Sequence, residues 1–117
     1  MKAYTDIEQS KKLAEILPLK SADMSWASTG LGKPFARTIP SKGYPEEICP
    51  CWSLAALLDA MPKCIDMYDL AIILSSPIEW GCVYQDINGN TKYECYMDNQ
   101  VDACVEMILK LKEKDLI

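Results

Sequence analysis

Residues 84–93 read Tyr84-Gln85-Asp86-Ile87-Asn88-Gly89-Asn90-Thr91-Lys92-Tyr93. Asn-Gly is the preferred dipeptide of a two-residue type I′ turn, which connects two antiparallel strands. Apolar and polar residues alternate on both sides of this dipeptide, as they do in strands with one buried face. The stretch therefore predicts a β-hairpin centred on Asn88 and Gly89.

The turn also predicts the register of the hairpin. Tyr96 is placed opposite Gly81, where its ring can cover the bare backbone. A slip of one residue would move one apolar set to the wrong face, so we expect the register to be fixed. Counting outward from the turn gives the pairs Tyr84–Tyr93, Cys82–Cys95 and Trp80–Met97 on the apolar face, and Gln85–Lys92 and Val83–Glu94 on the other.

A third strand is predicted at residues 69–74, which are mostly aliphatic and precede the turn residues Ser75-Ser76-Pro77. The three strands form an antiparallel meander. Such a meander with one apolar face is marginally stable alone, so we expect helices to cover it. Asn99 is a suitable N-cap for a final helix with an apolar stripe at Val101, Cys104, Val105, Ile108 and Leu111.

The N-terminal region begins with Thr5-Asp6-Ile7-Glu8, which has the Thr-x-x-Glu form of a capping box. This pattern predicts a helix with Thr5 as its N-cap. The helix should start at about Asp6 and end before Pro18, because the residue before a proline is disfavoured in a helix.

Residues 20–48 are less regular. Short alternations at 22–26 and 35–39 are interrupted by two glycines and a proline within 30–34, which predicts an irregular hairpin. Pro40, Gly43 and Pro45 predict an extended, turn-rich approach to a second helix. Pro50 suits the first position of that helix, which should continue to Met61.

These elements predict a single α+β domain over residues 1–117. An antiparallel β-meander and an irregular N-terminal hairpin pack against three helices, in the order α-β-β-α-β-β-β-α. A chain of 117 residues that is 50% hydrophobic is sufficient for one core, and no low-complexity linker divides it.

Composition narrows the classes of function. The apolar runs are far shorter than the roughly 18 residues of a membrane span. The acidic residues near the N-terminus do not fit a signal peptide. We therefore predict a cytoplasmic protein with no membrane contact. A net charge of −5 argues against nucleic acid as a partner, because binding to phosphates requires clustered Lys and Arg.

The chain contains no histidine, which excludes the ordinary Cys-His and Ser-His pairs of nucleophilic catalysis. Gly30-Leu31-Gly32-Lys33 lacks the spacing of a phosphate-binding loop. We therefore predict no catalytic residue, cofactor or metal, and we favour the interpretation that the chain is not an enzyme.

Cys49 and Cys51 are the candidate reactive thiols, because they flank Pro50 at the predicted start of a helix. A helix N-terminus lowers the pKa of a thiol, which would suit a redox sensor. The alternative that we favour is a capping residue and a core residue, since Cys-x-Cys is not the redox spacing Cys-x-x-Cys. A zinc site that also includes Cys64 lacks the paired short spacings of known structural sites.

Cys82 and Cys95 are predicted to face each other at a non-hydrogen-bonded pair, where a cross-strand disulfide could form. Reduced buried thiols are the favoured state in a cytoplasmic protein.

Trp26, Tyr44 and Trp52 are the candidate residues of an interaction surface, because rigid aromatic side chains are enriched at interfaces. Core packing explains Trp52 equally well.

Three blocks of the chain resemble a group of small proteins from the genomes, prophages and mobile elements of gut anaerobes. That group has no assigned function, so the resemblance implies an accessory context and no site residue, ligand or partner. The blocks are residues 4–18, which begin Tyr4-Thr5-Asp6-Ile7-Glu8, residues 50–59, which begin Pro50-Cys51-Trp52-Ser53-Leu54, and residues 102–111, which begin Asp102-Ala103-Cys104-Val105.

The sequence leads to two functional hypotheses. The first is a cytoplasmic accessory or interaction protein, of phage or mobile-element type, that binds another protein. An edge strand of the meander could also pair with a second copy to form a homodimer. The second hypothesis is a redox sensor or thiol-dependent enzyme centred on Cys49 and Cys51.

Overall fold

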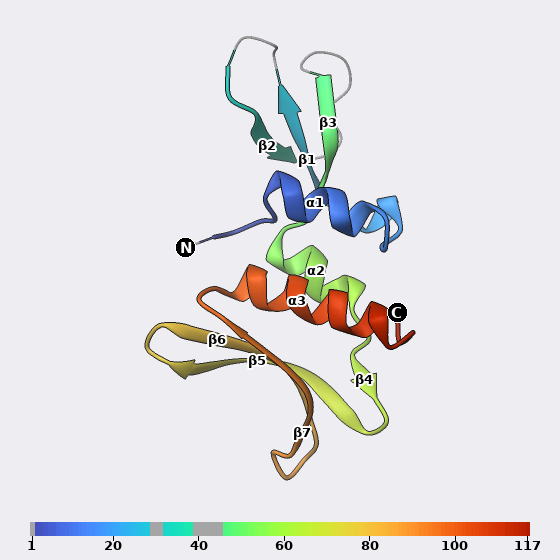
Figure 1. Cartoon of the computed structure of the whole chain (residues 1–117), viewed down its shortest axis with the longest axis vertical. Coiled ribbons are helices and arrows are strands. Elements are labelled where there is room, and N and C mark those ends of the chain that lie inside the picture. Colours follow the sequence, from blue (N-terminus) through green and yellow to red (C-terminus); the bar gives the residue numbers. More distant parts are fainter. Residues whose placement is uncertain (1, 29–31, 39–45) are drawn as a thin grey trace.

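Two antiparallel sheets lie at opposite ends of the molecule, and the helices lie between them (Figure 1). The computed structural model describes residues 2–28, 32–38 and 46–117. These residues form an α+β fold with the element order α-β-β-β-α-β-β-β-β-α, which confirms the predicted class and adds two strands to the predicted order. The additional strands are residues 46–51 and 64–65.

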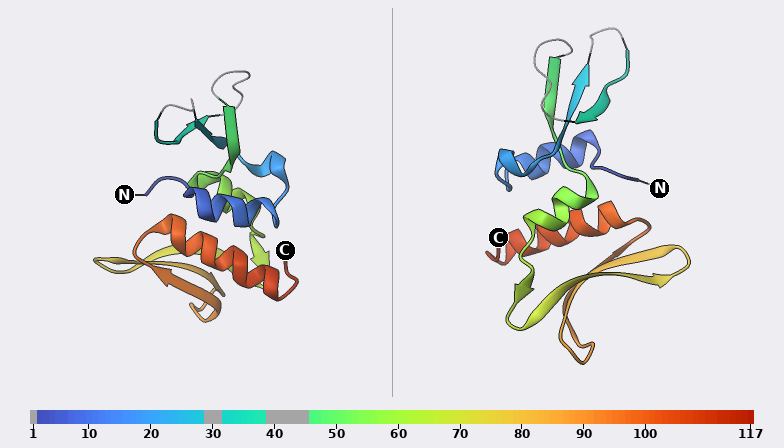
Figure 2. Two further views of the ribbon diagram at one scale, coloured as in Figure 1. Left: turned by 45° about the horizontal axis from the view of Figure 1, so that its top comes forward. Right: turned by 180° about the vertical axis from the view of Figure 1, so that it is seen from behind.

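The first sheet has the strand order β2-β1-β3 and the second has the order β4-β5-β6-β7. The turned views in Figure 2 show the same layers, with α3 against the second sheet. The elements are α1 (Ile7–Ala14), η1 (Leu19–Ser21), β1 (Met24–Ser28), β2 (Phe35–Thr38), β3 (Glu46–Cys51), α2 (Leu54–Ala60), β4 (Cys64–Ile65), β5 (Tyr68–Ser76), β6 (Glu79–Gln85), β7 (Thr91–Met97) and α3 (Gln100–Glu113).

Helix α1 begins one residue later than predicted. Asp6 is the N-cap, because its carboxylate accepts a hydrogen bond from the Gln9 amide at 2.7 Å and the Gln9 side chain accepts one from the Asp6 amide at 3.1 Å. The prediction of Thr5 and Glu8 as the capping pair was therefore wrong. Thr5 is fully buried, so its hydroxyl bonds to groups inside the protein and is not available to cap the helix.

The N-terminal segment is bound to the start of α2. Tyr4 forms a β-bridge with Ser53, the Thr5 amide donates to the Trp52 carbonyl at 2.9 Å, and the Leu54 amide donates to the Ala3 carbonyl at 3.3 Å. Backbone pairing therefore joins residues that are about 50 positions apart in the chain.

The prediction that Pro50 is the first residue of the second helix was wrong. Residues 46–51 form β3, which pairs antiparallel with β1 and places Pro50 opposite Ser25. An edge strand tolerates a proline because one of its sides needs no backbone donor. Helix α2 starts only at Leu54, where the hydroxyl of the N-cap Ser53 accepts from the Ala56 amide at 3.2 Å.

The irregular N-terminal hairpin is confirmed by β1 and β2, whose register runs from Met24–Thr38 to Ala27–Phe35. The predicted turn residues Gly30, Pro40 and Gly43 lie outside the described residues.

The β6–β7 register is confirmed from Trp80–Met97 to Tyr84–Tyr93, but the turn differs from the prediction. The Gly89 amide donates to the Asp86 carbonyl at 3.0 Å and the Asp86 amide to the Asn90 carbonyl at 2.9 Å, which defines a three-residue loop with Gly89 at φ 84°. Gln85 therefore pairs with Thr91 and not with Lys92. Lys92 is an extra residue on β7 that restores the predicted register beyond it.

The predicted contact between Gly81 and Tyr96 is also confirmed. The two residues are paired across β6 and β7, and a Cβ atom built on Gly81 would lie 2.6 Å from Cε1 of Tyr96. Only glycine allows the ring to lie this close to the strand.

The core is formed mainly by α3, α2 and the helix-facing side of the second sheet. Asn99 caps α3 as predicted, since its side chain accepts from the Asp102 amide at 2.8 Å. All five residues of the predicted apolar stripe are buried. None of the described helices has the length and apolar character needed to cross a bilayer.

The turn between β4 and β5 is strained, and one substitution should relieve it. Asp66 has φ 48° and Met67 has φ 74°, although neither is a glycine. The left-handed conformation costs roughly 1–2 kcal/mol for a residue with a Cβ atom, and Met67 is 85% exposed, so its side chain contributes little burial. We expect Met67→Gly to raise the free energy of unfolding by about 0.5–1 kcal/mol, after the greater freedom of glycine in the unfolded chain is subtracted.

Urea denaturation measures this change. Met67→Ala is the matched control, because it removes the same long side chain but keeps the Cβ atom. The strain is absent if alanine and glycine at position 67 give equal stability.

Candidate interaction surface

The second sheet has an edge that is only partly covered. Strand β4 pairs with β5 at Cys64–Asp69 and Ile65–Tyr68, and the Leu70 amide donates to the Lys63 carbonyl at 2.9 Å. No strand among the described residues pairs with this side of β5 beyond Leu70. We call residues 71–75, up to the turn at Ser76 and Pro77, the open edge of β5.

The direction of the backbone groups on this edge follows from the alternation of an antiparallel ladder. Since Leu70 directs its amide toward β4, Ile72 and Leu74 direct theirs to the same side, where β4 has ended. Ala71 and Ile73 direct theirs toward Val83 and Gly81 of β6. The open edge therefore offers the donors and acceptors of Ile72 and Leu74 to another strand.

Three of the outer strands, β2, β3 and β7, carry features that disfavour pairing with a further chain. Strand β2 contains Arg37, β3 contains Glu47 and Pro50, and β7 contains Glu94 and the extra residue Lys92. Charges, prolines and bulges are the usual protection of sheet edges. The open edge of β5 contains no charged residue and no proline, because no charge occurs between Asp69 and Glu79 and Pro77 lies beyond the edge. It does contain an irregularity at its end, where the register with β6 shifts between Leu74 and Ser76.

The open edge carries exposed apolar side chains at one end. Leu74 is 55% exposed and Ile78 is 81% exposed. Both lie near the tip of the β5–β6 hairpin, which extends past the helices (Figures 1 and 2). Because the tip extends past the helices, Leu74 is left in solvent although the preceding residues of its face, Leu70 and Ile72, pack against the core.

A groove lies at the other end of the open edge. It has a volume of about 300 Å³ and lies between α2 and β5. The Lys63 ammonium donates to the Leu58 carbonyl near the end of α2, so this charge is held at the end of the groove. The groove is lined by Leu58, Lys63, Leu70, Ala71 and Ile72.

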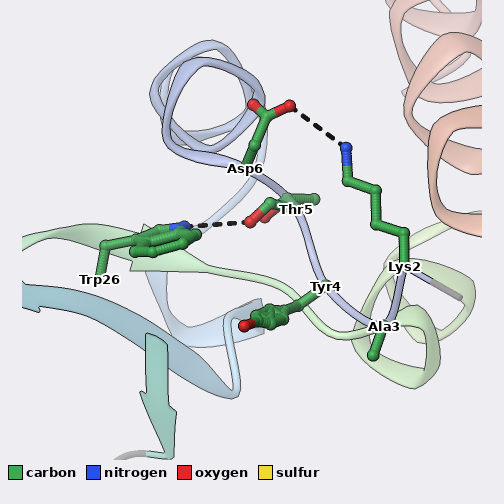
Figure 3. Close-up of a pocket in the computed structure, with 6 residues that line it drawn as sticks. All are labelled: Lys2, Ala3, Tyr4, Thr5, Asp6 and Trp26. Atoms are coloured by element: carbon green, nitrogen blue, oxygen red, sulfur yellow. Dashed lines mark hydrogen bonds and ion pairs between the residues drawn. The ribbon is translucent and has the colours of Figure 1, made fainter. Parts of the chain in front are cut away.

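A second pocket, of about 360 Å³, lies at the N-terminal segment (Figure 3). The Tyr4 and Trp26 rings meet there with centroids 5.8 Å apart. Its polar groups pair within the protein: the Trp26 indole donates to the Thr5 carbonyl at 3.0 Å, and the Lys2 ammonium bonds to Asp6 at 3.2 Å and to Asp102 at 2.7 Å. These contacts hold the N-terminal segment in place.

Of the three candidate residues Trp26, Tyr44 and Trp52, the two that the structure describes, Trp26 and Trp52, do not share an exposed surface. Trp26 is half-buried beside Tyr4, and Trp52 is fully buried with its indole donating to the Ser21 hydroxyl at 2.9 Å. Tyr44 lies outside the described residues. Trp52 is therefore a core residue, as the alternative interpretation proposed.

Cys49 and Cys51 lie on strand β3 and not at a helix N-terminus. Cys49 is 7% exposed and Cys51 is fully buried. Burial raises the pKa of both thiols, which is opposite to the shift that activates a cysteine. Among the described residues, no group of three or more Cys, Asp or Glu side chains is arranged to hold a metal ion.

Cys82 and Cys95 face each other as predicted, but their pair has a different type. Because the Asp86 amide bonds to β7, alternation directs the backbone groups of Tyr84 and Cys82 to β7 as well. The cysteines therefore form a hydrogen-bonded pair, in which the Cα atoms are about 5.5 Å apart, and not the closer type. Both thiols are free, and a hydrogen bond with Cys104, together with burial, raises the pKa of Cys82.

Comparison with protein-family models, with curated proteins and with solved structures finds no match for this chain. Its function is therefore inferred from the geometry described above.

Sequence reasoning identified an edge of the meander as a surface for pairing but did not identify which edge or which residues. The two-residue strand β4 is too short to give a periodic signal. The absence of charge between Asp69 and Glu79 was the one available indication.

Proposed function

We propose that this chain is an interaction protein that binds an extended segment of a protein partner by pairing with the open edge of β5. The observation that carries the proposal is the direction of the Ile72 and Leu74 backbone groups, which face a side of the sheet with no partner strand among the described residues. Strand addition at a sheet edge is a recurrent mode of peptide recognition, in which backbone bonds give affinity and side-chain pockets give specificity. The groove beside Leu58 supplies such a pocket.

Other classes of function have less support. A net charge of −5 disfavours nucleic acid. A redox sensor requires a thiol with a lowered pKa, whereas burial raises the pKa of Cys49 and Cys51. The accessory, mobile-element context implied by the resemblance and the cytoplasmic location stay predictions.

Site-specific photo-crosslinking in the cells that produce the protein tests this proposal. A photoreactive amino acid at position 74 should give a covalent adduct with a protein partner. The matched control carries the same amino acid at position 87, since Ile87 is 99% exposed but lies on the β6–β7 turn, away from the open edge. Equal adducts at both positions, or none at position 74, would contradict the proposal.

A further inference from the structure

We infer that the partner strand on the open edge is the same edge of a second copy of this chain. This inference rests on the proposed function and adds the identity of the occupant. Three observations carry it: the length of the open edge, the positions of an exposed leucine and a groove along it, and the charges at its two ends.

The length of the open edge selects one register for two copies. The Leu70 amide is used by Lys63, and Pro77 at the hairpin turn has no amide hydrogen, so residues 71–75 are available. An antiparallel pair centred on Ile73 aligns residues 71–75 of one copy with residues 75–71 of the other. Ile72 then lies opposite the partner's Leu74, and both direct their backbone groups into the interface, which gives four hydrogen bonds across the two-fold axis.

The exposed leucine and the groove are complementary in this register. Leu74 is 55% exposed on the face of β5 that also carries Ile72, and Ile72 lines the groove with Leu58. Pairing Leu74 with Ile72 of the second copy places the leucine at the groove. On each copy the groove and the exposed Leu74 lie on opposite sides of Ile73. A two-fold axis at Ile73 therefore places the leucine of each copy at the groove of the other.

The charges at the ends of the open edge also fit this arrangement. Lys63 marks one end and Glu79 lies at the hairpin tip beyond the other. The antiparallel register brings Glu79 of one copy toward Lys63 of the other, and opposite charges favour that orientation. Residues 70–78 are uncharged, so the paired residues 71–75 bring no like charges together.

The interface is small. Five paired residues and one leucine on each side bury less than the roughly 1,600 Å² of a standard interface. We therefore expect a weak dimer that is populated at micromolar or higher concentrations and that exchanges readily.

Disulfide trapping tests the register. In a Cys64→Ser background, which removes the exposed native thiol, Ile73→Cys should form an intermolecular disulfide under mild oxidation. In this register residue 73 of one copy lies directly opposite residue 73 of the other. The two form a non-hydrogen-bonded pair, in which side chains approach most closely. Ser75→Cys is the matched control, because in this register residue 75 of one copy lies opposite Ala71 of the other and not opposite the second residue 75. Trapping at position 75 and not at 73 would overturn the register.

Sedimentation equilibrium tests the dimer itself. Leu74→Pro removes two of the four interface donors without removing a β5–β6 bond, so it should raise the dimer dissociation constant at least about 30-fold. Ile87→Ala should leave the dissociation constant unchanged. A wild-type chain that stays monomeric at millimolar concentration would overturn the inference.

The photo-crosslinking experiment at position 74 separates the two proposals. An adduct of twice the 13.1 kDa chain mass supports the second copy. An adduct with a different protein overturns the dimer while leaving the proposed function intact. The absence of an adduct at position 74 counts against both.

Discussion

Thr5→Val is expected to lower the free energy of unfolding by about 3 kcal/mol, although valine has nearly the same shape as threonine. Thr5 is fully buried, and its hydroxyl lies 2.8 Å from the Ser10 hydroxyl and accepts the Trp52 amide at 3.1 Å. Valine leaves both of these buried groups without that partner, and each lost bond costs roughly 1–3 kcal/mol. Since the free energy of unfolding of a small domain is about 5–15 kcal/mol, this loss is a large share of the total stability.

Urea denaturation of the variant measures this loss. Thr5→Ser is the control, because serine keeps the hydroxyl and loses only a methyl group, at a cost of about 1 kcal/mol. The double variant Thr5→Val/Ser10→Ala should cost less than the sum of its single changes, because the two hydroxyls share one bond. If valine and serine at position 5 are equally destabilising, the hydroxyl network contributes no net stability.

Native thiol labelling is expected to differ between cysteines by a factor on the order of 10³. Cys64 is exposed and should react at the rate of a free thiol. Cys49 and Cys51 are buried and their pKa values are raised by burial, so they should react only after the structure opens. Peptide mass mapping after timed alkylation at neutral pH assigns a rate to each residue.

The same labelling in denaturing urea is the control, and there the cysteines should react at similar rates. Fast native labelling of Cys49 or Cys51, at or above the rate of Cys64, would support the redox hypothesis in place of the interaction hypothesis.

The register of β6 and β7 could be predicted because local signals agreed. The Asn88-Gly89 pair and the alternation of both strands pointed to one pairing. The turn type was wrong because Asp86 accepts the amides of Asn88 and Asn90, at 2.9 Å each, and so favours a longer loop. The extra residue at Lys92 then compensated for the longer loop.

Residues 46–53 could not be predicted in the same way. A proline is compatible both with the first turn of a helix and with an edge strand. Pairing with β1, which lies more than 20 residues away, decided between them at Pro50. The same dependence on distant contacts explains why Thr5 was mistaken for a cap.

The open edge of β5 depends on where β4 ends, and this boundary has no signal in the sequence. Cys64 and Ile65 form too short a run to predict a strand. The candidate surface was therefore predicted only as an unspecified edge of the meander.

Amide hydrogen exchange of β5, resolved by residue in dilute solution, tests most directly whether this edge is available for pairing. We predict that the amides of Ile72 and Leu74 exchange much faster than those of Ala71 and Ile73, which bond to β6. Equal protection of all four amides at the lowest concentration would show that the edge is already covered within a single chain and would contradict the proposed mode of binding.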